Sequence, residues 1–410
     1  MTVENQGIGK LYQQHSRQVL ATLIRLLGNF ELAEEALQEA FSAALRQWPE
    51  EGTPDHPVAW LIRAGHRKGI DHIRRRQTAQ RFAHLAMVEE DTPELLPGLG
   101  IADDQLRLLF ICCHPALSLD ARIALTLREM CGLSTEQVAS ALLQKPATLA
   151  QRIVRAKKKI RTAGIPYEVP EAKALPTRLP GVLKVIYLVF NEGYSRSDGS
   201  ALVDVSLSGE ATRLAEALAN LLPEGEVFGL LALMLLHDSR RQAREDACGD
   251  LVTLEDQDRS LWDQNQISLG LRWLEQALLK SPTGPYTLQA SIAAVHARAG
   301  SAEDTDWPRI VRLYDALYRQ QPSPVIGLNR AVAVAMRDGP EAGLALLDQL
   351  TGNKVILSYH LFHAARADLL RRAGAFKPAS TAYQRALELA TQAPERRFLE
   401  RRLRELTASS

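Results

Sequence analysis

The sequence predicts an all-α fold, and three observations support this prediction. Hydrophobic residues recur every three or four positions along almost every segment, which is the period of a helix, and hardly any segment alternates as a strand does. Glycine and proline fall between these periodic stretches. Hydrophobic residues make up 46% of the chain, which is enough to build sizeable cores. Because 410 residues exceed the usual size of one domain, we expect several helical domains.

Breaks in the helical pattern divide the chain into predicted parts. A first helical block is followed by an acidic stretch rich in proline and glycine, which is typical of a linker. A second helical block ends in a very basic helix, and paired helices follow after another proline-containing break. The predicted parts are residues 1–82, the linker 83–104, residues 105–166, residues 180–290 and residues 291–406.

The first block contains an acidic helix from Glu31 to Phe41. Its polar positions gather on one part of the helix, and an apolar stripe runs beside them through Leu37, Phe41 and Trp48. Like charges four residues apart cost an isolated helix roughly a few tenths of a kcal/mol, so the acidic face suits a basic partner. A solvated face is the commoner explanation of such a pattern alone. The candidate partner-binding residues are Glu34, Glu35, Gln38, Glu39 and Phe41.

A basic helix follows from Trp60 to Arg76. Asp71 is the one acid in this segment, and the cations opposing it are Arg63, Arg67, Lys68, Arg74, Arg75 and Arg76. A cationic helix with an aromatic residue at its start can grip a phosphate backbone and stack on an unpaired base. Core packing is the commoner role for a residue such as Trp60, so the arginines are the stronger candidates for nucleic-acid binding.

The segment from Gly132 to Arg161 predicts a helix-turn-helix. Gly132 can end one helix, and Ser134 with Gln137 forms the pattern of a capping box at the start of the next. A turn around Pro146 then precedes a second helix. In this motif the second helix lies in the major groove of DNA.

The second helix of this motif has two contrasting faces. Leu149, Ile153, Ala156 and Ile160 form its predicted core stripe. The predicted DNA-binding residues on the other face and toward the helix end are Thr148, Gln151, Arg152, Arg155, Lys157, Lys158 and Arg161. A run of charge alone favours a solvated basic face, whereas the preceding helix and turn favour DNA binding.

The region after residue 180 predicts paired helices. Ala367, Gly374, Ala379, Tyr383 and Ala386 have a spacing similar to that of a tetratricopeptide repeat, in which small residues let two antiparallel helices pack closely. Weaker pairs are predicted at residues 292–320 and 329–350, where generic helical hairpins are an equal alternative.

Polar and aromatic residues lie beside strongly apolar helices in this same region. They are Asn191, Glu192, Tyr194, Asp256, Asp258, Arg259 and Trp262. Two interpretations stay open: a buried hydrogen-bond network, which we favour, and a ligand cleft with a regulatory role. No glycine-rich phosphate loop or nucleophile motif is found, so we predict no enzyme and no cofactor.

The cysteines and the apolar runs bear on the compartment. Four cysteines in a chain of this length do not form a disulfide framework, and adjacent Cys112 and Cys113 with His114 lack the spacing of a metal site. The first residues have no signal-peptide pattern, and the longest apolar run, from Val227 to Leu236, is short of a membrane span. We therefore expect buried thiols in a soluble, cytoplasmic protein.

The order of acidic helix, basic helix, linker and helix-turn-helix resembles the extracytoplasmic-function sigma factors of the sigma-70 family. Glu34–Phe41 is similar to region 2.2, which implies docking on the β′ clamp helices of core RNA polymerase. Trp60–Arg75 is similar to regions 2.3 and 2.4, which implies melting and recognition of the −10 element. Gly132–Arg161 is similar to region 4.2, which implies recognition of the −35 element beside the β flap.

Departures from the family pattern leave the recognised promoter sequence open. Arg67 stands where region 2.3 usually has asparagine, and Ala147 and Gln151 stand where region 4.2 usually has glycine and serine.

The remaining chain resembles a sigma subgroup with a C-terminal tetratricopeptide-type domain. The resemblance lies in Phe110–Leu117, Tyr187–Tyr194, Gly229–His237 and Asp256–Arg259. It implies that the extension regulates activity and has a possible peptide or protein partner. The competing hypothesis is a helical-repeat adaptor that binds nucleic acid nonspecifically.

Overall fold

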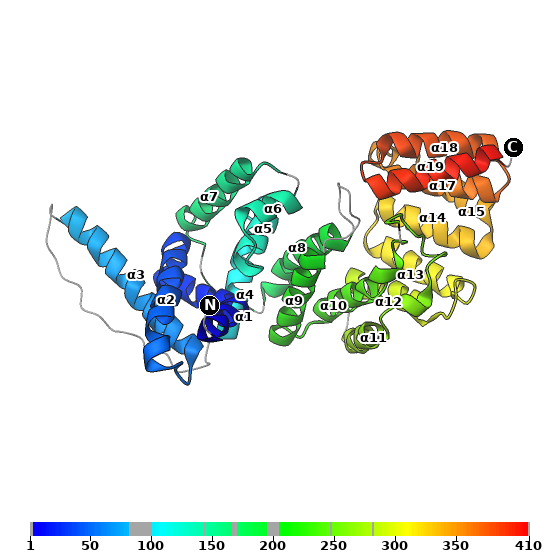
Figure 1. Cartoon of the computed structure of the whole chain (residues 1–410). Helices are drawn as coiled ribbons and strands as arrows, with labels where there is room; N and C mark the ends of the chain where they lie inside the picture. The colour runs from blue at the N-terminus through cyan, green and yellow to red at the C-terminus, as the bar shows by residue number, and fades with distance from the viewer. Residues whose placement is uncertain are drawn as a thin grey trace. The chain divides into compact units, whose positions relative to one another are not determined.

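A computed structural model describes residues 3–81, 101–142, 144–165, 167, 170–171, 173–194, 205–246, 248–280 and 283–408. These residues form helices and one isolated β-bridge between Glu245 and Leu251, with no strand among them, which confirms the predicted all-α fold. The chain forms two compact units, Met1–Ile186 and Tyr187–Ser410 (Figure 1). Among the described helices, none is long and apolar enough to cross a membrane.

The first unit begins with three helices that pack against one another: α1 (Val3–Leu27), α2 (Phe30–Glu51) and α3 (Pro57–Arg81). Asn29 caps α2 by accepting a hydrogen bond from the backbone N–H of Leu32 at 2.9 Å. Gly65 lets α3 approach the other two helices, because a Cβ there would lie 2.9 Å from a methyl group of Leu23 and 3.2 Å from the carbonyl oxygen of Ala36.

The same unit continues with α4 (Ile101–Cys112), α5 (Leu119–Leu125), the π-helical turn η1 (Thr126–Met130), α6 (Thr135–Ala141) and α7 (Pro146–Thr162). The C-terminal boundary predicted for the linker, residue 104, lies too far along the chain, because helix α4 already begins at Ile101. Asp104, placed in that linker by its charge, is buried instead and pairs with Arg25 of α1 at 2.6 Å and with Arg107 at 2.7 Å. The rest of the predicted linker, up to residue 100, lies outside the described residues.

Helix α8 (Leu175–Tyr194) contains residues of both units, and the second unit is helical throughout its described part. Its helices are α9 (Val205–Leu221), α10 (Gly225–Asp238), η2 (Arg241–Ala243), η3 (Arg259–Leu261), α11 (Gln264–Leu278), α12 (Pro285–Arg298), α13 (Trp307–Gln320), α14 (Pro324–Asp338), α15 (Pro340–Leu350), α16 (Lys354–Leu357), α17 (His360–Arg372), α18 (Phe376–Leu389) and α19 (Ala393–Ala408). Helix α10 packs against α9, α11 and α12 and is buried along most of its length, as expected for a helix that is apolar on all sides.

Paired helices occupy the predicted segments of the C-terminal region, since α12 packs against α13, α14 against α15 and α17 against α18, whereas their tetratricopeptide type stays a prediction. Helices α13 to α15 pack in sequence, and α17, α18 and α19 lie side by side (Figure 1). Gly343 of α15 permits close packing on α14, since a Cβ there would lie only 2.5 Å from the Cβ of Ala335. Ala367 and Ala379 are fully buried between α17 and α18, and Gly374 ends α17 with φ of +76°.

Candidate nucleic-acid interface

The predicted helix-turn-helix is confirmed in its local geometry. Gly132 has φ of +78°, a conformation that favours glycine. The hydroxyl of Ser134 accepts a hydrogen bond from the backbone N–H of Gln137 at 3.2 Å, and the Gln137 side chain accepts one from the backbone N–H of Ser134 at 2.7 Å. This reciprocal capping box starts α6, and Pro146 starts α7 at a position where its missing N–H costs nothing.

The two faces of α7 are arranged largely as predicted. Leu149, Ile153, Ala156 and Ile160 are buried, which confirms the core stripe. Arg152 is half-buried and donates a hydrogen bond to the side chain of Gln144 at 2.7 Å. The exposed members of the predicted DNA-binding set are Thr148, Gln151, Arg155, Lys158 and Arg161.

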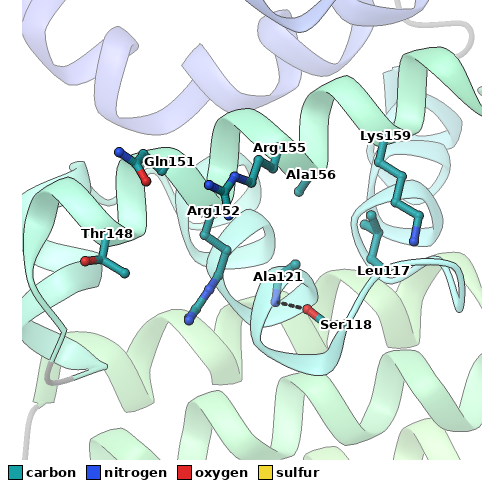
Figure 2. A pocket seen from close by; sticks show the side chains of 9 residues that line it. All are labelled: Leu117, Ser118, Ala121, Thr148, Gln151, Arg152, Arg155, Ala156 and Lys159. Carbon is teal, nitrogen blue, oxygen red and sulfur yellow. Dashed lines mark hydrogen bonds between the residues drawn. The ribbon is translucent and has the colours of Figure 1, made fainter.

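A groove of about 320 Å³ lies between α7 and the start of α5 (Figure 2). One wall holds Thr148, Gln151, Arg152, Arg155, Ala156 and Lys159, and the other holds Leu117, Ser118 and Ala121. The residues of the second wall are not among those that the sequence predicts for DNA binding. Its signal is the cap of α5, where the hydroxyl of Ser118 accepts a hydrogen bond from the backbone N–H of Ala121 at 3.4 Å. The groove therefore gathers guanidinium, ammonium, amide and hydroxyl groups that can bind phosphates and base edges.

Lys157 requires a correction, because it is buried rather than available for a phosphate contact. Its side chain is only 7% exposed, and its Nζ lies 3.0 Å from a carboxylate oxygen of Glu34 and 3.0 Å from one of Glu129. Burial opposes the charge of Lys157, but the two carboxylates outweigh it and raise the pKa of the ammonium group. The physical reason is its place four residues after Ile153, which puts Lys157 beside the core stripe.

The acidic residues of α2 face two different groups of cations. Glu35 lies 3.6 Å from His72 of α3, and Glu39 lies 2.9 Å from the same ring and 3.9 Å from Lys68. Both glutamates stay at least 40% exposed, and Gln38 between them is exposed. These three residues form an accessible polar face on α2, whereas Glu34 points to Lys157.

Phe41 also requires a correction, since it is part of the core and not of a partner-binding face. It is 5% exposed, and its ring packs edge-on against Tyr12 with 4.8 Å between centroids. Phe41 continues the apolar stripe of Leu37 and Ala44, and the packing of α1 against α2 buries that stripe.

Helix α3 presents exposed arginines as predicted. Arg63, Arg67 and Arg74 follow one another at steps of four and seven, which places them on one face, and Arg75 adjoins it. Lys68 is half-exposed beside Glu39, and the side chain of Arg76 lies outside the described residues. Trp60 is half-buried against Trp48 with 5.3 Å between ring centroids, so its ring has a packing role at the start of α3.

The aromatic residues of the candidate regulatory cleft lie among arginines in the second unit. The Tyr194 ring is buried and stacks on Phe190, and its hydroxyl accepts a hydrogen bond from Arg240 at 2.9 Å. Trp262 is buried with the guanidinium groups of Arg240 and Arg259 at 5.6 and 4.8 Å from its ring. Such contacts between guanidinium groups and aromatic rings stabilise the packing of connecting segments.

The polar residues of this set make structural contacts. Arg259 donates hydrogen bonds to the carbonyl oxygens of His296 and Ala299 at 2.6 and 2.7 Å, which satisfies the end of α12. Asp258 caps η3 at Ser260, and Asp256 lies 3.8 Å from Arg402 of α19.

Asn191 and Glu192 of α8 complete the set. Both side chains are half-buried, and the hydroxyl of Tyr187 on the same helix donates a hydrogen bond to the side chain of Gln289 at 3.4 Å. The contacts of the whole set favour the network interpretation, and the regulatory cleft stays a prediction.

Two half-buried histidines in this network predict acid sensitivity. Burial, assisted by nearby arginines, lowers the pKa of His237 to about 3 and that of His296 to about 4. The unfolded chain therefore binds more protons than the folded chain below the ordinary histidine pKa of about 6.5, so stability falls as pH decreases from there toward 4. At pH 5 each histidine is expected to cost up to about 2 kcal/mol of unfolding free energy.

Denaturant titrations between pH 7.5 and 5 check this expectation. Replacing His237 with Gln, which does not titrate, should weaken the dependence of the unfolding free energy on pH. If the slope of the unfolding free energy against pH is the same in His237→Gln, in His296→Gln and in the unaltered chain, these two rings do not cause the acid sensitivity.

Comparisons with protein families match three segments of the chain. A model of sigma-70 region 2 matches residues 11–79, and a model of sigma-70 region 4 matches residues 107–160. A family of unknown function, DUF6596, matches residues 178–278. The first two matches cover α1–α3 and α4–α7, which hold the exposed cationic faces.

Comparisons with individual proteins give relatives over the whole chain and over its first part. An uncharacterized protein of Rhizobium meliloti is 46% identical over 398 residues, which cover 95% of this chain and 94% of that protein. A probable ECF RNA polymerase sigma factor SigI of Mycobacterium tuberculosis is 26% identical over 49% of this chain and 68% of its own length. An ECF RNA polymerase sigma factor SigK of a Mycobacterium species is 27% identical over 35% of this chain and 75% of its own length. No solved structure shows a significant match.

Proposed function

We propose how the helices of this chain divide the work of transcription initiation, because the chain belongs to the extracytoplasmic-function sigma factors of the sigma-70 family. It is an alternative sigma factor with a C-terminal helical extension, and it directs transcription initiation. Core RNA polymerase and promoter DNA are its partners. The observation that supports the division is that exposed arginines line α3 in one sigma region, while exposed cations line the α7 groove in the other.

The acidic face of α2 binds core polymerase in this proposal. Glu35, Gln38 and Glu39 are accessible and carry the charge that complements a basic surface such as the β′ clamp helices. The four exposed arginines of α3 contact the backbone of the −10 region and help to hold it open.

Helix α7 reads the −35 element in this proposal, next to the β flap. Thr148 and Gln151 lie near the start of the helix, where base edges are reached in a helix-turn-helix, and Arg155, Lys158 and Arg161 lie farther along for phosphates. Only exposed side chains can contact the −35 element, so the buried Lys157 is not one of the DNA-binding residues.

In our proposal the second unit regulates this activity and catalyses no reaction. The protein acts in the cytoplasm, where core polymerase and promoter DNA are present. Arg397 and Arg372 tie the segment around Asp250 and Glu255 to α19 and α17, so the segment after α10 is fixed to the C-terminal helices. A unit held together by such ties can present a stable surface to a peptide or protein partner.

Runoff transcription with purified core polymerase tests the proposed function. The full chain is expected to produce discrete transcripts from a genomic fragment library, whereas core polymerase alone should not. A chain shortened after Ile186, where the first compact unit ends, is expected to change the transcript yield at least threefold if the second unit regulates activity. The shortened chain is first checked for retained helical circular dichroism.

Two outcomes contradict parts of the proposal. Absence of polymerase-dependent transcripts from any fragment would favour the adaptor hypothesis. Equal yields from the full and the folded shortened chain would remove the regulatory role of the second unit.

A further inference from the structure

Three arginines of the second unit gather around two aromatic rings. The guanidinium groups of Arg240 and Arg259 lie 5.6 and 4.8 Å from the centre of the Trp262 ring. Arg240 also donates a hydrogen bond to the hydroxyl of Tyr194 at 2.9 Å, and the guanidinium group of Arg244 lies 3.8 Å from the centre of that tyrosine ring. We call Arg240, Arg244 and Arg259 the arginine cluster.

The hydrogen-bond partners of the arginine cluster in the described part of the chain are neutral. Arg240 donates to a tyrosine hydroxyl, Arg244 to a tyrosine carbonyl oxygen, and Arg259 to two carbonyl oxygens at the end of α12 and to a threonine hydroxyl. Neighbouring Arg241 differs, because it forms an ion pair with Asp238. The positive charge of the cluster is therefore not neutralised by a contacting carboxylate of the described residues.

Partial burial makes this positive charge costly. Burial lowers the pKa of the Arg259 guanidinium group and Arg240 lowers it further, although two acids between α12 and α13 oppose this. Burial is also the main cause that lowers the pKa of Arg244, despite opposing groups that include Asp238 and Glu245. An anion beside the cluster would compensate its charge, and this attraction is stronger where water is partly excluded.

The Trp262 side chain supplies a second, independent observation. It is 3% exposed, and its indole Nε1–H has no hydrogen-bond acceptor among the described residues. A buried indole N–H usually has an acceptor, because an unpaired buried donor loses its hydration without replacement. An anionic oxygen is the kind of acceptor that the two guanidinium groups beside the same ring also attract.

We propose that Arg240, Arg259 and the indole N–H of Trp262 bind the phosphate groups of a small anionic molecule. Guanidinium groups match phosphate oxygens in both charge and geometry. Because the two guanidinium groups are placed around one indole ring, a ligand with two linked phosphates suits them better than a single phosphate ion. Both arginines keep part of their surface exposed, so an anion can approach from solvent.

A ligand bound here would connect several segments of the second unit. Arg240 precedes η2 and contacts the end of α8 through Tyr194, whereas Arg259 lies in η3 and contacts the end of α12. Binding would hold these segments together and stabilise the second unit by mass action. The consequence for transcription rests on the proposed function, in which this unit is regulatory, whereas binding itself does not.

The nuclear magnetic resonance signal of the Trp262 indole N–H tests the site in the full chain without polymerase. The chain has five tryptophans, so isotope-labelled tryptophan gives five indole signals, and Trp262→Phe identifies the one that belongs to Trp262. Pyrophosphate, added at constant ionic strength, is expected to shift this signal with a dissociation constant on the order of 1 mM or lower. Pyrophosphate bound only to the exposed arginines of α3 or α7 would leave the signal in place.

Two variants of Arg240 and a matched control complete the design. Arg240→Gln should weaken pyrophosphate binding about tenfold or more, because it removes a charged hydrogen-bond donor. Arg240→Lys keeps the charge without the planar guanidinium group and should recover part of the affinity. Arg319→Gln removes an exposed arginine of α13 outside the cluster and should bind as the unaltered chain does. Helical circular dichroism shows whether each variant folds.

The outcomes separate this site from the proposed function. A Trp262 signal that does not move up to about 10 mM pyrophosphate overturns the site, even where transcription is observed. Equal pyrophosphate affinity in Arg240→Gln and in the unaltered chain overturns the role of the arginine cluster, and a response to citrate alone overturns the assignment to phosphate groups. Pyrophosphate binding by a chain that gives no polymerase-dependent transcript supports the site and contradicts the proposed function.

Discussion

Reversing both Glu35 and Glu39 to Lys is expected to weaken core polymerase binding about 100-fold, which corresponds to about 2.7 kcal/mol. Each glutamate is at least 40% exposed on the accessible face of α2, so its charge is available to a partner. A reversal replaces attraction to a basic surface with like-charge repulsion, and such juxtapositions cost several kcal/mol. Titration of labelled sigma factor with core polymerase measures the loss.

The control for this reversal lies on the same helix. Glu50 and Glu51 are exposed at the end of α2, and changing both to Lys alters the net charge equally. That variant should bind core polymerase within about threefold of the unaltered chain at moderate salt.

The reversed lysines also face His72 and Lys68, so thermal unfolding must be followed in parallel. Equal losses in both pairs of substitutions would mean that net charge, and not the acidic face, determines binding.

The features that are predicted correctly from the sequence depend on residues close together along the chain. The capping box at Ser134 and Gln137 and the core stripe of α7 follow from spacing along one helix, and both are found in the structure. Gly65 and Gly343 mark close helix approaches, but their partners Leu23 and Ala335 are known only from packing.

The features that the sequence predicts wrongly depend on contacts between segments that are far apart along the chain. Lys157 looks like the middle of a basic run, yet the neighbouring Glu34 and Glu129 are 123 and 28 positions away, and no local pattern pairs them. The family resemblance places Phe41 in the docking segment, although its spacing with Leu37 already puts it on the apolar stripe. The network around Tyr194 likewise requires Arg240 and Arg244 from another segment.

Replacing both Arg155 and Lys158 with Ala is expected to weaken promoter binding by the polymerase complex and to reduce its salt dependence. Both side chains are exposed on α7, and Arg155 lines the groove shown in Figure 2. Each lost phosphate contact releases about 0.9 fewer counterions, so the slope of log affinity against log salt should fall by about 1.8 for the pair. At low salt the affinity should drop on the order of 10- to 50-fold for all promoter sequences alike.

Two comparison variants decide whether these cations contact phosphates. Lys173→Ala removes an equally positive, highly exposed side chain outside α7 and should leave the slope unchanged. Gln151→Ala, at the start of the helix, should alter the preferred −35 sequence while keeping the slope, because a base contact is nearly independent of salt. An unchanged slope in the Arg155 and Lys158 double variant would contradict their role on the backbone. A sequence-specific loss in that variant would instead move these two side chains to base edges, which requires α7 to enter the groove more deeply than the helix-turn-helix geometry implies.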